Sequence, residues 1–249
     1  MEMLSLKDVY LSYHTAEGET EALAGVTFGV EKGEFVALVG PSGCGKTTVL
    51  SAVCGLIPIT SGSITLDGKA VSAPSGNVGY MLQRDTLFEW LTIEKNVWLG
   101  LKVRKMLTEE NKRYAHSLLV KYGLGEFARS MPEQLSGGMR QRVALIRTLA
   151  FRPKVLLLDE PFSALDYQTR IDVGDSVTEI IKQEGVTALF VTHDVTEACA
   201  LADKIVVLSA RPAVVKRIFD APRSSSPNER RTDGTANDLT DAIWKELKN

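Results

Sequence analysis

Glycine, lysine and hydroxyl residues gather in one short segment with the spacing of a phosphate-binding loop. The segment is Gly40, Pro41, Ser42, Gly43, Cys44, Gly45, Lys46, Thr47 and Thr48, which matches G-x-x-x-x-G-K-[ST]. A strand-like run precedes it and a helix-like run follows, which is the context that a P-loop requires. Glycines let backbone N–H groups face phosphate oxygens, and the start of a helix adds positive potential. The alternative is a glycine-rich turn that binds nothing.

The side chains of this segment have separate expected roles on ATP. Lys46 supplies a full charge near the β- and γ-phosphates and is a catalytic candidate. The Thr47 hydroxyl is a hard oxygen ligand suited to Mg²⁺, while Thr48 reaches toward the other phosphates. Cys44 lies inside the loop but is given no catalytic role, because P-loops tolerate several residue types there.

Two adjacent carboxylates follow the apolar run of KVLLLDEP. Ligands collect at the carboxyl ends of strands in open α/β sheets. Successive strand residues point to opposite faces, so Asp159 and Glu160 are expected to have different roles. Asp159 is suited to hold Mg²⁺, through water, and Glu160 to polarise the water that attacks the γ-phosphate. The alternative is an acidic helix cap after a core strand.

A histidine follows the strand-like run of TALFVTHD. A single histidine at a strand end is usually structural. The position of His193 after the strand that follows the acidic pair favours another role, a hydrogen bond to the γ-phosphate that keeps the attacking water in line.

A second helix start with anion-binding residue types lies in EQLSGGMRQRVALIRTLA. Ser136, Gly137 and Gly138 open this helix, so their N–H groups and the serine hydroxyl form a second phosphate-seeking site. One chain therefore carries an ATP cradle and a separate anion site.

The composition predicts an ordinary globular protein. The chain has 249 residues, of which 44% are hydrophobic and 24% charged, and its formal net charge of -2 disfavours a duplex-DNA partner. No apolar run reaches the roughly 18 residues of a membrane span, and the start of the chain lacks a secretion signal, so we expect a cytoplasmic location. Three widely spaced cysteines argue against a disulfide framework or a zinc site.

Short strand-like runs alternate with helical ones, which predicts an α/β fold with a mainly parallel sheet. Hairpin-like strands open the chain, and helical signals replace strand signals at residues 84–150, so we expect an inserted helical subdomain there. We assign residues 1–220 to one ATPase domain and residues 221–249 to a polar linker with a tail helix. The linker APRSSSPNERRTDGTAND is expected to be loosely ordered, and DLTDAIWKELK to form a short amphipathic helix.

Together, the P-loop, the acidic strand and the LSGGMRQ segment resemble the ATP-binding cassette (ABC) ATPases over about residues 3–220. The resemblance implies a P-loop NTPase core with an N-terminal antiparallel β subdomain and an inserted helical subdomain. It implies that Ser136–Gly138 complete the ATP site of a second, head-to-tail copy. It also implies that Tyr13 stacks on adenine, that Gln83 acts in catalysis and senses Mg²⁺ and the membrane partner, and that residues 163–166 cross the dimer interface. Tyr13 as a mere edge-strand residue and Gln83 as a surface amide are the alternatives.

Met139 stands where the most common family signature has glutamine. With Met139 and the segments YMLQRDTLFEW and PFSALDYQTR, the sequence most resembles the nitrate, sulfonate, taurine and pyrimidine-precursor importer branch. The resemblance implies a homodimer at the cytoplasmic face of the membrane, bound to integral-membrane permease subunits and served indirectly by a solute-binding protein. Phe88 and Trp90 are our candidates for the groove that receives the permease.

Two other functions are open at this point. A soluble ABC ATPase outside transport usually has two cassettes, a coiled-coil insertion or a basic face, and this sequence has none of them. A regulatory module without catalysis is disfavoured because Glu160 and Ser136 are both present.

Overall fold

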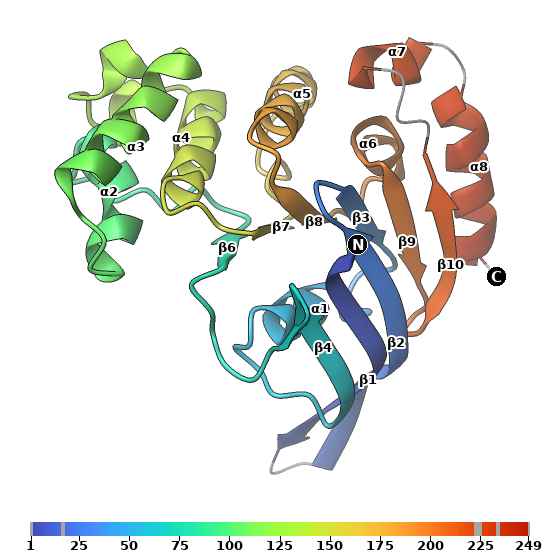
Figure 1. The fold of residues 1–249 in the computed structure, drawn as a ribbon. Helices are drawn as coiled ribbons and strands as arrows, with labels where there is room; N and C mark the ends of the chain where they lie inside the picture. Colours follow the sequence, from blue (N-terminus) through green and yellow to red (C-terminus); the bar gives the residue numbers. More distant parts are fainter. Residues whose placement is uncertain (1, 16–17, 222–225, 233–234, 249) are drawn as a thin grey trace.

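The computed structural model describes residues 2–15, 18–221, 226–232 and 235–248, and they form two sheets with helices between and around them (Figure 1). The first sheet is antiparallel, with strand order β2-β1-β4-β5. Its strands are β1 Glu2–Thr15, β2 Gly18–Glu31, β4 Ser61–Leu66 and β5 Lys69–Ala70. Asp67 and Gly68 have positive φ angles of 50° and 72° and form the turn between β4 and β5.

The second sheet has six strands in the order β10-β9-β3-β8-β7-β6, of which β10 alone is antiparallel to its neighbour. Its strands are β3 Phe35–Val39, β6 Val78–Met81, β7 Val155–Asp159, β8 Thr187–Val191, β9 Lys204–Leu208 and β10 Val215–Asp220. The predicted fold class, α/β with a mainly parallel sheet and an antiparallel N-terminal sheet, is confirmed.

The parallel sheet is covered on both faces. Along β3, Phe35, Ala37 and Val39 belong to one hydrophobic core. This core is shared with five helices: α2 Ile93–Val103, α3 Glu109–Lys121, α4 Gly137–Leu149, α5 Tyr167–Gln183 and α6 Val195–Leu201. Val36 and Leu38 belong to a second core, shared with helix α1 (Lys46–Val53) and the antiparallel sheet. Strands buried on both faces are expected to be continuously apolar, which explains why FVALV and VLLL lack alternation.

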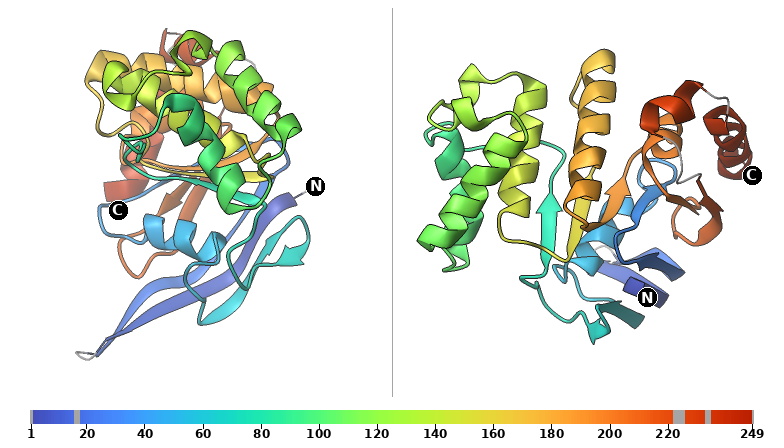
Figure 2. Two further views of the ribbon diagram at one scale, coloured as in Figure 1. Left: turned by 90° about the vertical axis from the view of Figure 1, so that its left-hand side faces the viewer. Right: turned by 45° about the horizontal axis from the view of Figure 1, so that its top comes forward.

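Three helices gather on one side of the parallel sheet (Figures 1 and 2). They are α2 Ile93–Val103, α3 Glu109–Lys121 and α4 Gly137–Leu149, with short 3-10 turns at Gly125–Phe127 and Pro132–Gln134. Each helix begins at a hydroxyl residue whose side chain accepts a backbone N–H bond. These caps are Thr92, Thr108 and Ser136. The helices fall within residues 84–150, and their grouping into a separate subdomain stays a prediction.

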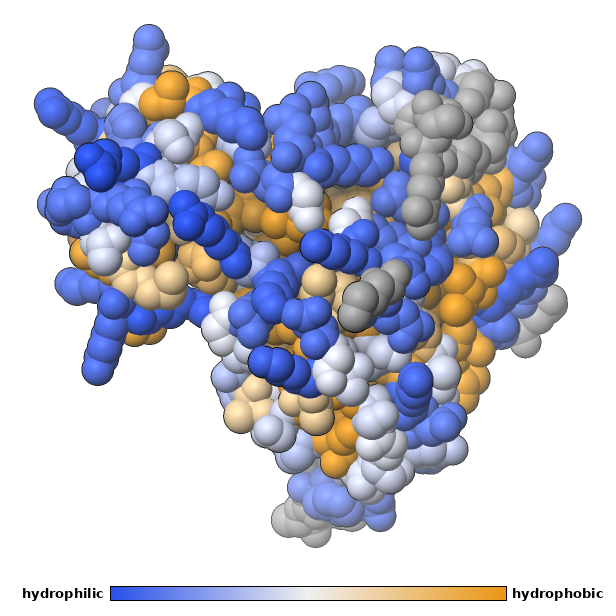
Figure 3. Space-filling model, in the orientation of Figure 1, coloured by the Kyte–Doolittle hydropathy of each residue, from blue (hydrophilic) through white to orange (hydrophobic). Residues whose placement is uncertain are grey.

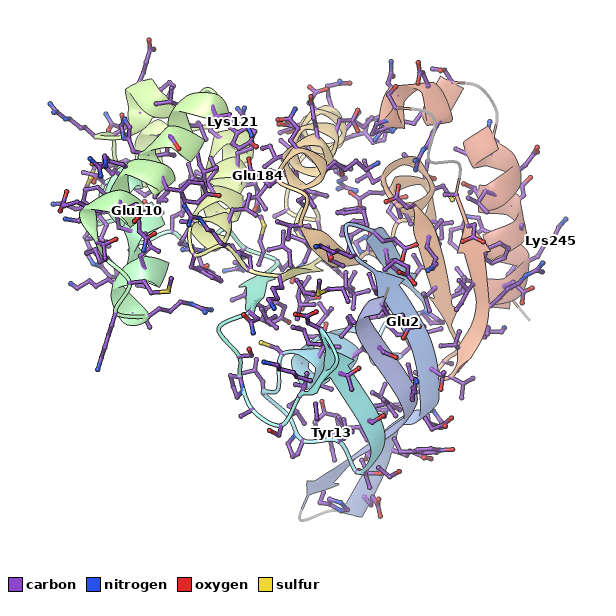
Figure 4. The ribbon with its side chains drawn as sticks, viewed as in Figure 1. Glu2, Tyr13, Glu110, Lys121, Glu184 and Lys245 are labelled. Atoms are coloured by element: carbon purple, nitrogen blue, oxygen red, sulfur yellow. The ribbon has the colours of Figure 1, made fainter. Side chains whose placement is uncertain are left out.

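The remaining helices are α5 Tyr167–Gln183, α6 Val195–Leu201, α7 Pro227–Thr232 and α8 Thr235–Lys248. Lys121 on α3 forms a 2.6 Å ion pair with Glu184, just past the end of α5, and so connects the α2–α4 group to the rest of the molecule (Figure 4). Helix α8 lies beside β9 and β10 (Figures 1 and 2). It spans the residues of the predicted tail helix, and its Ile243 is fully buried in a hydrophobic core.

The prediction of a loosely ordered linker is wrong for residues 227–232, which form α7, and for residues 235–238, which belong to α8. Arg230 is 1% exposed and lies 3.7 Å from a carboxylate oxygen of Asp203. Arg231 forms two bonds to Asp175, of 2.7 and 2.8 Å. The polar composition of this segment predicted disorder. It could not reveal the pairing with Asp203 and Asp175, because these residues are distant in sequence. Residues 222–225 and 233–234 of the predicted linker lie outside the described residues.

Among the described residues, no helix has the length and apolar character that a membrane span requires. The face in Figure 3 is largely hydrophilic, with smaller hydrophobic patches between the charged side chains.

Candidate nucleotide site

Two glycines of the loop between β3 and α1 have backbone angles that other residues rarely adopt. Gly43 has φ 73° and Gly45 has φ 116°, both in the region that disfavours a side chain. A Cβ on Gly40 would lie only 2.9 Å from Cys44 Sγ. Gly45 is also the N-cap of α1, and no side chain caps this helix. The first N–H groups of α1 are therefore suited to an anionic ligand.

The lysine of the loop lies over the loop's own carbonyl groups. Lys46 is 6% exposed, and its Nζ donates to Gly40 O at 2.8 Å and to Pro41 O at 3.0 Å. Its charge is therefore held within the predicted phosphate cradle. Burial raises the pKa of the neighbouring Cys44 thiol, so this side chain is neutral at physiological pH.

Tyr13 lies at the edge of the same loop. It projects from β1, in the part of the molecule that carries α1 (Figure 4), and its hydroxyl is 3.1 Å from Thr48 Oγ1. The side chain is 37% exposed. An exposed aromatic ring beside the P-loop suits a stacked base, the role that the resemblance implies for Tyr13.

The Asp159 carboxylate faces α1. Its Oδ1 accepts a 3.2 Å bond from the Thr47 hydroxyl and its Oδ2 a 3.1 Å bond from the Tyr80 hydroxyl. Burial raises the pKa of Asp159, and the two hydrogen bonds act against this effect. A hydroxyl and a carboxylate side by side fit Mg²⁺, which prefers a few hard oxygen ligands together with phosphate oxygens. Among the described residues, no group of three or more acidic, histidine or cysteine side chains offers another metal site.

Glu160 follows Asp159 directly, but its side chain contacts a different residue. Its φ of 45° is unusual for a residue with a side chain, and its N–H donates to Val191 O at 2.9 Å. Its Oε2 lies 3.2 Å from His193 Nδ1. Asp159 therefore faces Thr47 while Glu160 faces His193, an arrangement that matches the separate roles predicted for them.

Gln83 reaches the acidic strand through one intermediate. It lies two residues after β6, and its Nε2 donates to Ser163 Oγ at 3.0 Å. Ser163 Oγ in turn donates to the carbonyl oxygen of Glu160 at 3.0 Å. The predicted glutamine is thus connected to the backbone of the predicted base.

The second predicted anion site lies at the start of α4. The Ser136 hydroxyl accepts from Met139 N at 3.3 Å. A Cβ on Gly138 would lie 2.6 Å from Val173 Cγ2 of α5, so this glycine also permits close helix packing. Helix α4 belongs to the core on the opposite side of the parallel sheet from α1. In the part of the chain that the structure describes, no hydrogen bond joins residues 136–138 to residues 40–48. A single chain therefore does not bring its two predicted phosphate sites together.

Comparison with known proteins agrees with this geometry. The family model described as ABC transporter matches residues 23–163, which include the P-loop, the start of α4 and the acidic pair. The chain belongs to the ABC transporter family. It is an ATPase of that family, and the predicted resemblance is confirmed.

Several ABC transporter ATP-binding proteins match most of the chain. YtlC of Bacillus subtilis, an uncharacterised member, is 44% identical over 99% of this chain and 96% of its own length. The nitrate import protein NrtD of Synechocystis is 41% identical over 86% of this chain and 80% of its own length. Import subunits for aliphatic sulfonates and taurine are similar at 39% and 41% identity.

A solved structure supports the same ABC fold. The dimeric ATP-binding cassette MJ0796, bound to ADP and Pi, has a TM-score of 0.73 and 31% identity. The match covers 88% of this chain and 99% of that one.

Tyr80 is a site residue that the ABC family pattern did not predict. It pairs with Leu157 across β6 and β7, and Asp159 lies two residues further along β7 on the same face. The sequence signal was an aromatic hydroxyl in a short strand, but its relation to Asp159 depends on which strands are neighbours.

Proposed function

We propose that this chain is the nucleotide-binding, ATP-hydrolysing subunit of an ABC importer. The observation that carries the proposal is the assembly of Thr47 with Asp159, and of His193 with Glu160, at the carboxyl ends of adjacent strands beside a P-loop. This arrangement can hold a triphosphate and activate water on it.

In the proposed reaction the P-loop N–H groups and Lys46 hold the β- and γ-phosphates of ATP. Glu160 accepts a proton from water as the water oxygen bonds to the γ-phosphorus, and the bond from that phosphorus to the bridging oxygen breaks to give ADP and phosphate. His193 keeps the water and the γ-phosphate aligned. Its contact with Glu160 supports this positioning role.

Thr47, and Asp159 through water, are the proposed Mg²⁺ ligands, with Gln83 as a further ligand. The metal would neutralise charge on the β- and γ-phosphates. The facing oxygen atoms of Thr47 and Asp159 support this part of the proposal.

The complete site is proposed to form between two copies. ATP on one P-loop contacts Ser136, Gly137 and Gly138 of the other copy in a head-to-tail homodimer. Hydrolysis removes these bridging contacts and the copies separate. The separation of α4 from α1 by the parallel sheet supports this arrangement, as does the dimeric state of MJ0796.

We further propose that this opening and closing drives solute uptake through integral-membrane permease subunits at the cytoplasmic face of the membrane. A solute-binding protein would deliver the solute to the permease. The similarity to nitrate, sulfonate and taurine import subunits supports a small anionic or pyrimidine-like solute.

Replacement of the proposed base tests the reaction. Glu160→Gln should keep ATP affinity, slow phosphate release by roughly 100-fold or more, and accumulate an ATP-bound dimer. Phosphate release and sedimentation with Mg-ATP measure these effects. Glu110→Gln, an exposed change on α3, is the matched control. Wild-type hydrolysis by Glu160→Gln would remove Glu160 from its role.

A further inference from the structure

Arg170 joins two loops of the ATP site. It lies in the first turn of α5, and its guanidinium reaches back to the preceding loop, where Nη2 donates to Leu165 O at 3.1 Å. On the other side, Nη1 lies 3.9 Å from a carboxylate oxygen of Asp194, the residue after His193. One side chain therefore contacts both the loop that begins at Ser163 and the turn that carries His193.

These contacts of Arg170 complete a closed ring of interacting residues that includes Glu160. The Glu160 carbonyl accepts from Ser163 Oγ at 3.0 Å, and its carboxylate lies 3.2 Å from His193 Nδ1. Arg170 connects these two partners through Leu165 and Asp194. Five of the ring residues, Glu160, Ser163, Arg170, His193 and Asp194, line one small cavity.

Hydrogen bonds, rather than burial, must set the position of the histidine. The His193 side chain is 52% exposed, so packing restrains it weakly. Its turn is held by Thr192, whose hydroxyl accepts from Asp194 N at 3.0 Å and donates to Glu197 Oε2 at 2.6 Å. Arg170 adds the connection from this turn to α5.

Arg170 and Glu197, which line one small pocket, each have a buried polar atom. The Arg170 Nε atom is buried and has no hydrogen-bond partner among the described residues, and the same holds for Glu197 Oε1. Burial raises the pKa of Glu197 to about 7, while the Arg170 charge acts in the opposite direction. Arg170, Asp194 and Glu197 line the same two pockets, and the 3.9 Å ion pair places the guanidinium beside Asp194.

We propose that Arg170 is a positioning residue for ATP hydrolysis, which keeps His193 aligned with Glu160 by holding Asp194 against the loop at residues 163–166. The inference rests on the proposed roles of His193 and Glu160. It makes the alignment of His193 depend on that loop.

Steady-state kinetics of the full chain test the proposal. Arg170→Ala should lower kcat by on the order of 10–100-fold, because a displaced positioning group costs rate at the chemical step. KM for ATP should change by less than about twofold, since the P-loop contacts are untouched. Arg170→Lys keeps the charge and should recover part of the loss. Asp194→Asn keeps the cap of α6 but removes the ion pair, and should lower kcat in the same way.

Arg231→Ala is the matched control. Arg231 lines the same surface pocket as Arg170, but its two bonds are to Asp175 on α5. The kcat of the Arg231→Ala variant should stay within about twofold of wild type. Thermal unfolding of each variant separates loss of stability from loss of rate.

A double variant tests the route through the histidine. Arg170→Ala should cause no further loss of kcat in a His193→Ala background, because both changes remove the same alignment of His193 with Glu160. An unchanged kcat in Arg170→Ala, additive losses in the double variant, or an equal loss in Arg231→Ala would overturn the proposal. Absence of hydrolysis in the wild-type chain would instead contradict the proposed function.

Discussion

Both oxygens of the Asp159 carboxylate accept a hydrogen bond, from Thr47 on one side and Tyr80 on the other. If the Thr47 hydroxyl turned to a bound metal, Oδ1 of Asp159 would be free to face that metal, while the Tyr80 hydroxyl would keep Oδ2 in place. Groups behind a ligand fix its orientation in this way in many metal sites. The Tyr80 hydroxyl is therefore expected to prepare Asp159 for Mg²⁺.

Tyr80→Phe should raise the Mg²⁺ concentration needed for half-maximal ATP binding by roughly tenfold, because loss of such a supporting group weakens metal affinity. A Mg²⁺ titration of fluorescent ATP analogue binding measures this shift. Tyr10→Phe, at an exposed tyrosine of β1, is the control. An unchanged titration curve for Tyr80→Phe would show that the hydroxyl does not orient Asp159.

Most of these residues could be predicted because their chemistry is local. The P-loop spacing and the Asp159–Glu160 pair each occupy a few consecutive positions, and they follow β3 and β7, which have only β8 between them in the sheet. Tyr80 could not be predicted in this way, nor could Arg170, because each acts on a residue distant in sequence. Their roles depend on strand order and on helix packing.

At the scale of elements, the segment after β6 presents aromatic rings on a rigid support. Asn96 of α2 is fully buried, and its side chain bonds the backbone of Phe88 and Leu91. Trp90 is 71% exposed and packs edge-to-face on Phe88, with ring centroids 4.9 Å apart. A fixed, exposed aromatic pair is typical of a binding surface.

Trp90→Ala should weaken co-purification with the permease subunit by about tenfold or more, since exposed tryptophans often dominate binding energy. Solute uptake should fall with it. Trp244→Ala, at a tryptophan of α8 that is 45% exposed, controls for the loss of an aromatic ring. Unchanged co-purification and uptake in Trp90→Ala would make the groove assignment wrong.

Element predictions succeeded where periodicity and caps were local. The start of α4 followed from Ser136. Helix α7 was missed because its stabilising partners, Asp203 and Asp175, are distant from it in sequence. The polar composition of this segment could not reveal ion pairs with such distant residues.

At the scale of the molecule, the chain carries two helix starts that are predicted to bind anions, on opposite sides of the parallel sheet. The P-loop at α1 and Ser136 at α4 each have the features of half a phosphate site. Two copies in a head-to-tail arrangement would bring each P-loop against the other copy's α4. Dimerisation is therefore central to the proposed activity.

A mixing experiment tests this claim most directly. Lys46→Ala disables the P-loop and Ser136→Arg disables the start of α4, so each variant alone should form no ADP. Mixed in equal amounts, they should form about a quarter of the wild-type ADP in the first turnover, because half of the dimers are mixed and each mixed dimer has one intact site of two. No recovery in the mixture, or wild-type hydrolysis by Ser136→Arg alone, would contradict a site shared between two copies.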